Sequence, residues 1–238
     1  VSIRMDSWVV LQKVEARLGD SNFYAGASYS YFNTEVTFDT IPGRPIISEI
    51  LKRLNTNSTI SAIRPGVTYD SRNNAFTPTK GINAEVSVNY SAKWLGSSDD
   101  FTTLHTDFLA YLPISERLNS GWRFQGSYLL GEAPFYAYPF VSLRGIPALR
   151  YQGDNVLVSE TEWSYNVYRR WTLLGFFGGG KAFSDFGDFG QANWAYTVGT
   201  GFRYKVARLL GVDMGADFAW GNGEDFAFYI VFGTSWLR

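Results

Sequence analysis

The chain has 238 residues, of which 18% are aromatic and 24 are glycine, with a formal net charge of -1 and no cysteine. This length suits a single all-β domain or barrel and does not require two domains. The net charge gives no basic footprint of the kind that nucleic-acid binders carry, so no nucleic-acid partner is expected. The lack of cysteine excludes a disulfide scaffold.

Hydropathy leaves the membrane question open. No run of 18 or more apolar residues appears, which excludes a transmembrane helix but not a transmembrane β-barrel, whose strands alternate apolar and polar residues. Residues 1–6 lack the apolar core and the cleavage site of a secretory signal. We therefore expect the chain to be mature, trimmed or part of something longer.

The first elements of the chain differ in clarity. Residues 7–18 fit a helix capped by Ser7, but their alternation also fits a strand, which we favour. From Phe23 to Tyr31, aromatic residues and alanines hold every second position, which predicts a strand. Residues 40–57 form a long connection, in which the amphipathic stretch 46–54 predicts one or two helical turns in a surface loop.

The clearest strand runs from Ile82 to Trp94, with one apolar and one polar face. A soluble sandwich strand could show the same pattern. Its length favours a membrane strand, because a tilted strand needs roughly 9 to 11 residues to cross a bilayer, whereas soluble strands cluster at about 5 to 6. Tyr90 and Trp94 near one end suit an aromatic girdle at the membrane interface.

His105 and Asp107 are two positions apart and should project from the same strand face. Such a pair could belong to a hydrolase dyad in a barrel. No nucleophile accompanies them in the sequence, since Thr106 points to the other face, so an enzyme is not expected. A single histidine without cysteine gives no convincing metal-ligand set.

The connection at residues 139–151 is too apolar for an ordinary exposed loop. Pro139 and Pro147 break regular structure, yet several side chains between them favour burial. We expect the loop to fold back into a barrel lumen and to bring Arg144 and Gly145 inside. The side chains that favour burial are Phe140, Val141, Ile146 and Leu149.

Alternation continues on both sides of this loop, with about six strands predicted before it. A soluble sandwich seldom has so many long alternating strands, whereas a barrel with lipid outside and water inside does. The strands expected after the loop lie near residues 154–168, 170–183, 193–206, 211–221 and 225–236.

Residues 175–182 match the nucleotide-binding pattern G-x-x-x-x-G-K. Ala182 stands where that pattern needs Ser or Thr for magnesium, and no helical pattern follows, so no cofactor is expected. We interpret these glycines as leaving room beside a strand for the returning loop.

Two motifs carry a family resemblance. Leu143-Arg144-Gly145-Ile146 resembles the arginine-glycine signature on the in-folded surface loop of the BamA/TamA family of outer-membrane assembly factors, although that family usually has Phe or Tyr at the place of Ile146. Asp70-Ser71-Arg72, followed by Phe76-Thr77-Pro78-Thr79-Lys80-Gly81, resembles a short periplasmic turn of the same family. The resemblance covers roughly Tyr69 to the C-terminus and implies five strands after the loop.

The resemblance also bears on the partner of Arg144. The family has an aspartate in an aromatic-x-Asp-x-Gly pattern, and the matching place here is Gly178, so that partner is missing. Glu160 and Glu162 share the expected lumen face, and a covered guanidinium needs a carboxylate to offset its desolvation. We therefore expect Arg144, Gly145, Glu160 and Glu162 to pin the loop; the alternative is that both glutamates are solvated lumen charges unrelated to it.

The last predicted strand places aromatic and aliphatic side chains on one face. An aromatic near the carboxyl end is similar to the terminal signal by which outer-membrane barrels are recognised for insertion. The alternative is a plain last strand. The candidate insertion-signal residues are Phe228, Ile230, Phe232 and Trp236.

Together these patterns predict an all-β fold: a transmembrane antiparallel up-and-down β-barrel of about 12 strands, or part of the family's usual sixteen, with an in-folded loop. Residues 1–238 are expected to form this one domain, without a periplasmic domain. The resemblance implies insertion or transport of proteins at the bacterial outer membrane, with membrane lipid, client proteins and accessory subunits as partners. The alternatives are a passive pore and a barrel hydrolase.

Overall fold

The structure is a computed structural model that describes residues 3–38, 56–207, 211–223 and 225–236. Within them the chain forms one 11-stranded sheet in which every strand pairs only with its sequence neighbours. All pairings are antiparallel, so the sheet has up-and-down topology with β1 and β11 as its edges. The strands are β1 (Ile3–Arg17), β2 (Phe23–Phe38), β3 (Thr56–Asp70), β4 (Gly81–Ser91), β5 (Phe101–Pro113), β6 (Leu118–Gly131), β7 (Asn155–Tyr168), β8 (Trp171–Phe183), β9 (Ala195–Ala207), β10 (Val212–Trp220) and β11 (Phe226–Phe232).

Short 3-10 helices lie in three of the connections: η1 (Lys93–Leu95), η2 (Phe135–Ala137) and η3 (Phe186–Gly190). None of the helices in the described ranges is both long and apolar enough to cross a membrane. The helical turns predicted at residues 46–54 lie outside the described residues.

The exposed outer face of the sheet is rich in large apolar side chains. In β4, Ile82, Val86 and Tyr90 are exposed, whereas Ser87 and Ser91 on the opposite face are buried. A soluble protein would bury the apolar set instead. The alternation read from the sequence is therefore confirmed, with the apolar face outside and the polar face inside.

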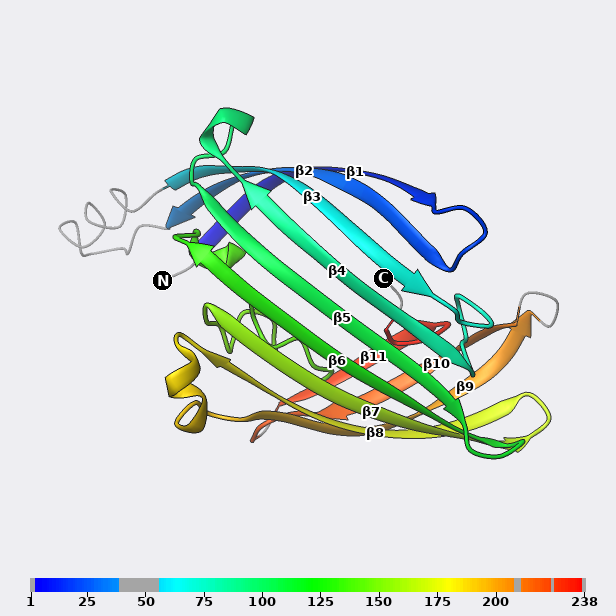
Figure 1. Cartoon of the computed structure of the whole chain (residues 1–238). Coiled ribbons are helices and arrows are strands. Elements are labelled where there is room, and N and C mark those ends of the chain that lie inside the picture. Colours follow the sequence, from blue (N-terminus) through cyan, green and yellow to red (C-terminus); the bar gives the residue numbers. More distant parts are fainter. Residues whose placement is uncertain (1–2, 39–55, 208–210, 224, 237–238) are drawn as a thin grey trace.

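The sheet curls around the connection between β6 and β7, which lies against its inner face (Figure 1). β1 and β11 are not hydrogen-bonded to one another. The six strands before this connection and the five after it agree with the predicted positions, and the sheet in the described residues thus has 11 strands rather than about 12.

Two predicted strand ends need correction. β4 stops at Ser91, and Trp94 lies in η1, where its ring packs 6.4 Å from that of Tyr90. β11 stops at Phe232 rather than near residue 236, because Gly233 adopts a positive φ of 76° and bends the chain. The bend turns Trp236 toward the interior.

The turn between β3 and β4 reaches across to the far end of the chain. Arg72 makes a bidentate contact with Asp70, at 2.9 and 2.7 Å, and this side-chain hydrogen bond raises the pKa of Arg72. The Thr77 hydroxyl donates to the carbonyl of Gly211, in the turn before β10. The Thr234 amide donates to the carbonyl of Phe76 at 2.7 Å, so this turn joins segments that are distant in the sequence.

Candidate functional site

The segment between β6 and β7, residues 132–154, holds Arg144 inside the curled sheet, and we call it the arginine loop. Its side chains Val141, Leu143 and Ile146 are buried against Val156 and Val158 of β7. The apolar character of the loop therefore did predict its folding inward. Ile146 lies in this apolar cluster, at the place where the resembling family has an aromatic residue.

Gly145 allows the loop to approach the sheet closely. Its φ of 82° lies in the left-handed region, and a Cβ there would sit 3.1 Å from the backbone carbon of Ala219 in β10. The Gly145 amide donates to the Tyr229 hydroxyl of β11 at 3.0 Å. On the preceding residue, the carbonyl of Arg144 accepts from the hydroxyl of Thr197 in β9. The backbone of the loop tip is thus hydrogen-bonded to side chains of β9 and β11 and lies close to β10.

Glycines of β8 leave the room that the loop occupies. A Cβ on Gly180 would lie 2.8 Å from Cγ1 of Val141, and one on Gly178 would lie 3.0 Å from both Cδ2 of Leu143 and Cγ of Glu160. Gly178 is the place where the resemblance puts an aspartate. Its pairing partner Glu160 fills that space, so the carboxylate comes from β7 instead of β8.

The structure brings Arg144 to both predicted glutamates. Its Nε donates to Glu160 at 2.7 Å and its Nη1 donates to Glu162 at 2.7 Å. The same Nη1 lies 2.9 Å from Asp217 of β10, a carboxylate that the sequence analysis did not connect with the loop. The guanidinium carbon stands 3.4 Å from the centre of the Phe176 ring, which adds a cation–π contact.

Further charges and polar groups complete the cluster. Arg203 of β9 contacts Asp217 at 2.5 Å, and Arg123 of β6 contacts Glu160 at 3.4 Å. The Ser235 hydroxyl donates to Asp217 at 2.7 Å, and the Trp236 indole donates to Glu160 at 2.8 Å. We call the six charged residues the arginine network: Arg123, Arg144, Arg203, Glu160, Glu162 and Asp217.

The charges of the arginine network balance. Glu160 and Asp217 have fully buried side chains, and each accepts from more than one donor. Burial alone would lower the pKa of the Arg144 guanidinium, but the neighbouring carboxylates of Glu162, Glu160 and Asp217 raise it above its usual value. Arg144 therefore remains charged, and its loop is tied electrostatically to β7 and β10.

Comparison with known proteins places the chain in a family. Residues 9–145, more than half of the chain, match the model of the Omp85 superfamily domain, a match that ends at Arg144 and Gly145. The chain belongs to the Omp85 superfamily. The match begins well before Tyr69, so the family resemblance extends further toward the N-terminus than the motifs indicated.

The fold of this Omp85 chain is similar to a solved structure, described as the crystal structure of BamA from Haemophilus ducreyi lacking POTRA domains 1–3. The two share 14% sequence identity with a TM-score of 0.71, over 97% of this chain and 55% of that one. At this identity the similarity shows the fold alone, and the Omp85 chain spans little more than half the length of that structure. A search of curated proteins gave no match.

The candidate insertion-signal residues of the Omp85 chain separate into two groups. Phe228, Ile230 and Phe232 are exposed on the outer face of β11. Trp236 is buried instead, where its indole contacts Glu160 and its ring packs against Tyr111. The local bend at Gly233 is what removes Trp236 from the outer face, and no strand pattern would have revealed it.

His105 acquires a neighbour that the sequence could not indicate. Its Nδ1 lies 3.0 Å from the hydroxyl of Ser127 on the adjacent strand β6, because β5 and β6 pair these two residues directly. The expectation that no nucleophile accompanies His105 is therefore wrong in three dimensions. Within the described ranges, no group of three or more His, Asp or Glu side chains could hold a metal ion.

The glycine-rich match to a nucleotide loop lies wholly within strand β8. Lys181, the lysine of that match, donates to the carbonyl of Phe189 at 2.7 Å rather than facing a loop that could cradle phosphates. Two of its glycines, Gly178 and Gly180, leave room for the arginine loop, as interpreted from the sequence, whereas Gly175 and Gly179 do not contact the loop.

Proposed function

We propose that this Omp85 chain forms a transmembrane barrel in the bacterial outer membrane and acts there in the insertion or transport of proteins. The observation that carries the proposal is the arginine loop, which lies on the inner face in contact with the arginine network, in a chain whose exposed outer face is rich in apolar side chains. A loop held by charge inside a lumen can obstruct it and can be released when those contacts change.

Membrane residence is tested by extraction and gel mobility. The exposed rows of Phe, Tyr, Trp and Leu on the outer face would associate in water, so the protein should need detergent and show the heat-modifiable mobility of barrels. A monomer that stays soluble without detergent contradicts the proposal.

Control of the lumen is tested in planar bilayers. The parent should be mostly blocked, and Arg144→Ala should raise conductance and expose the loop to protease, because it removes the contacts to Glu160, Glu162 and Asp217 together. Replacing all three carboxylates by their amides should act in the same direction. If both variants match the parent in conductance and protection, the loop is held by its apolar residues alone.

The role in protein insertion is tested by reconstitution. Liposomes that contain the chain should speed the folding of an unfolded outer-membrane barrel protein, compared with empty liposomes. The Arg144→Ala variant reports whether the loop takes part. A steady open channel without any effect on client folding favours the passive pore instead.

A hydrolase is a second candidate, because Ser127 and His105 lie within hydrogen-bond distance. Ester hydrolysis by the purified barrel that is lost in both Ser127→Ala and His105→Ala would establish it. Hydrolysis that is absent from the parent, or that persists in both variants, rules it out.

A further inference from the structure

The outer face of the sheet carries a hollow of about 500 Å³ over strands β4 to β8. Its floor consists of small residues that form two directly paired sets on neighbouring strands. Thr106 pairs with Gly126, and Ser159 pairs with Gly179. The side chains around it are large and apolar, and most are exposed: Phe108, Phe124, Leu157 and Trp194. Walls of this kind suit an apolar chain and provide few hydrogen-bonding groups for a polar ligand.

Three charged residues line the same hollow: Glu85, Asp107 and Lys181. Glu85 and Asp107 alternate with the exposed Val86 and Phe108 and so lie on the inner face, which leaves Lys181 as the charged residue of the lining on the outward face. It shares the outward face of β8 with Gly179 and pairs with the exposed Leu157. Its side chain is nonetheless buried, with 5% exposure. The ammonium lies 4.7 Å from the ring centre of Phe189 and 4.8 Å from that of Trp194, so two aromatic rings enclose it.

The charge of Lys181 has no carboxylate partner among the described residues. Its one hydrogen bond there goes to the neutral carbonyl of Phe189, although an ammonium has three donors. The buried guanidinium groups of Arg123, Arg144 and Arg203 each contact at least one carboxylate. A buried cation without a counter-charge is costly, so a ligand anion at this position would be bound favourably.

The order of residues along β8 relates the charge to the hollow. β8 begins at Trp171 and runs toward the connection that contains η3. Phe177, Gly179 and Lys181 follow one another on the outward face of this strand. Lys181 is therefore close to the end of the strand, and Gly179 lies one step deeper along it. An amphiphile with its anion at Lys181 would place its chain over Gly179, Ser159 and Gly126.

We propose that this hollow is a lipid site: it holds an acyl chain of a membrane lipid, and Lys181 binds the phosphate of the headgroup. The inference rests on the proposed function, because it needs the outer face of the sheet to lie in lipid. Charge complementarity selects a phosphate-bearing lipid over a neutral one. The apolar walls select a lipid over free phosphate, because burial of an acyl chain removes apolar surface from water.

The test is native mass spectrometry of the folded protein in detergent. The probes are palmitoyl-oleoyl phosphatidylglycerol, the diacylglycerol with the same chains, and glycerol phosphate as a soluble competitor. Lys181→Met removes the charge, and Ser159→Leu fills the hollow without changing the charge. Lys93→Met is the control, because Lys93 lies in η1 shortly after the end of β4 and has Asp100 as its partner at 3.8 Å.

The parent should retain phosphatidylglycerol in preference to diacylglycerol. Lys181→Met should weaken this retention about tenfold and abolish the preference, as expected for the loss of one charge-assisted contact. Ser159→Leu should weaken the retention of both lipids, whereas Lys93→Met should behave as the parent.

In a barrel that retains lipid, three results overturn the lipid site. They are equal retention of the two lipids by the parent, full retention by both Lys181→Met and Ser159→Leu, and displacement of the lipid by glycerol phosphate, which would indicate a plain phosphate site. Heat-modifiable mobility, measured on every variant, separates this failure from failure of the barrel itself. A folded barrel that retains no lipid refutes only the lipid site, whereas a parent that is soluble without detergent refutes both.

Discussion

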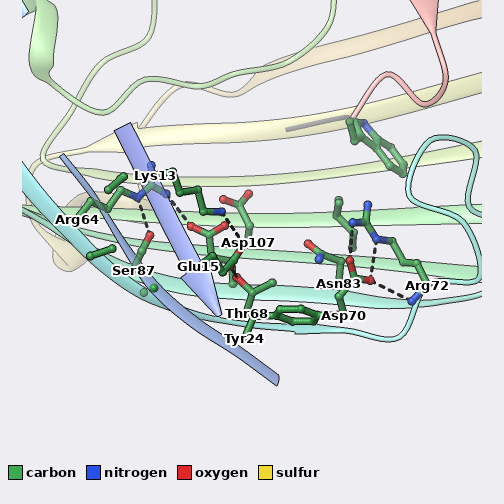
Figure 2. Close-up of a pocket in the computed structure, with 17 residues that line it drawn as sticks. Lys13, Glu15, Tyr24, Arg64, Thr68, Asp70, Arg72, Asn83, Ser87 and Asp107 are labelled. Carbon is green, nitrogen blue, oxygen red and sulfur yellow. Dashed lines mark hydrogen bonds and ion pairs between the residues drawn. The ribbon is translucent and has the colours of Figure 1, made fainter. Parts of the chain in front are cut away.

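The inner face of the sheet has two regions that use the same residue types differently. Beside the arginine loop, Glu160 and Asp217 are fully buried and each contacts more than one cation. On β1 to β5, a polar cavity of about 400 Å³ holds the pairs Lys13–Glu15, Arg64–Glu85 and Arg72–Asp70 (Figure 2). These pairs stay partly exposed, and the arginine loop does not line this cavity.

The comparison indicates that cover by the arginine loop determines how much an ion pair contributes to the free energy of unfolding. A partly exposed pair in water contributes about 0 to 1 kcal/mol, since solvent screens it. Breaking a buried pair costs on the order of 3 to 5 kcal/mol, because a charge is left uncompensated in a poorly solvated place. Substitutions in the two regions should therefore differ in effect, although the residues removed are alike.

The largest effect should come from Asp217→Ala. The change leaves Arg203 buried without its carboxylate, and it should lower the free energy of unfolding by roughly 3 to 5 kcal/mol. A urea titration followed by gel mobility measures this. The double variant Asp217→Leu with Arg203→Leu removes both charges and should lose clearly less; an equal or larger loss in the double variant would show that burial of charge is not the cause.

The next effect concerns the loop tip, where Gly145→Ala combines a strained φ with a close approach to the Ala219 backbone. We expect a loss on the order of 2 to 4 kcal/mol in the free energy of unfolding. Gly19→Ala is the matched control: Gly19 has a φ of 60°, but a Cβ there would meet nothing within 4 Å. Equal losses in the two variants would mean that the contact with β10 adds nothing.

A smaller effect should follow when the room for the loop is reduced. Gly180→Ala would place a Cβ 2.8 Å from Val141, which should cost about 1 to 3 kcal/mol and increase protease cleavage within the loop. Gly175→Ala on the same strand would meet only a carbonyl oxygen at 3.8 Å and should be nearly neutral. Cleavage that rises equally in both variants would contradict this role of Gly180.

The smallest effect belongs to the open cavity. Arg64→Ala breaks a contact of 3.1 Å with Glu85, yet both side chains are partly exposed. The free energy of unfolding should fall by about 1 kcal/mol or less, and the difference should shrink further at high salt. A loss as large as that of Asp217→Ala would abolish the distinction between the two regions.

Much of the fold could be read from the sequence, because alternation is a local signal. The polar and apolar faces were assigned correctly from Ile82 to Ser91, and the apolar side chains of residues 139–151 indicated burial. Glu160 and Glu162 could be proposed as partners of Arg144 because they face inward on the strand that follows the loop.

The remaining parts of the site depend on distances that alternation does not encode. Asp217 and Arg144 are 73 positions apart, and only the curl of the sheet brings β10 to the loop. The same reason applies to Arg203: alternation indicates that its side chain points inward, but it does not indicate that Asp217 is its partner. Trp236 was misplaced for a different reason: one glycine conformation after β11 reversed its direction.

The turn between β3 and β4 has a consequence for the order of assembly. Its hydroxyl contact from Thr77 to Gly211 spans 134 positions of the chain, and its neighbour Phe76 binds the segment after β11. Closing so large a loop is entropically costly, and folds rich in such distant contacts fold slowly. Hairpins between neighbouring strands can form early, but this junction has to wait until the last strands are in place. Completion of the fold is thereby coupled to the arrival of the segment that follows β11.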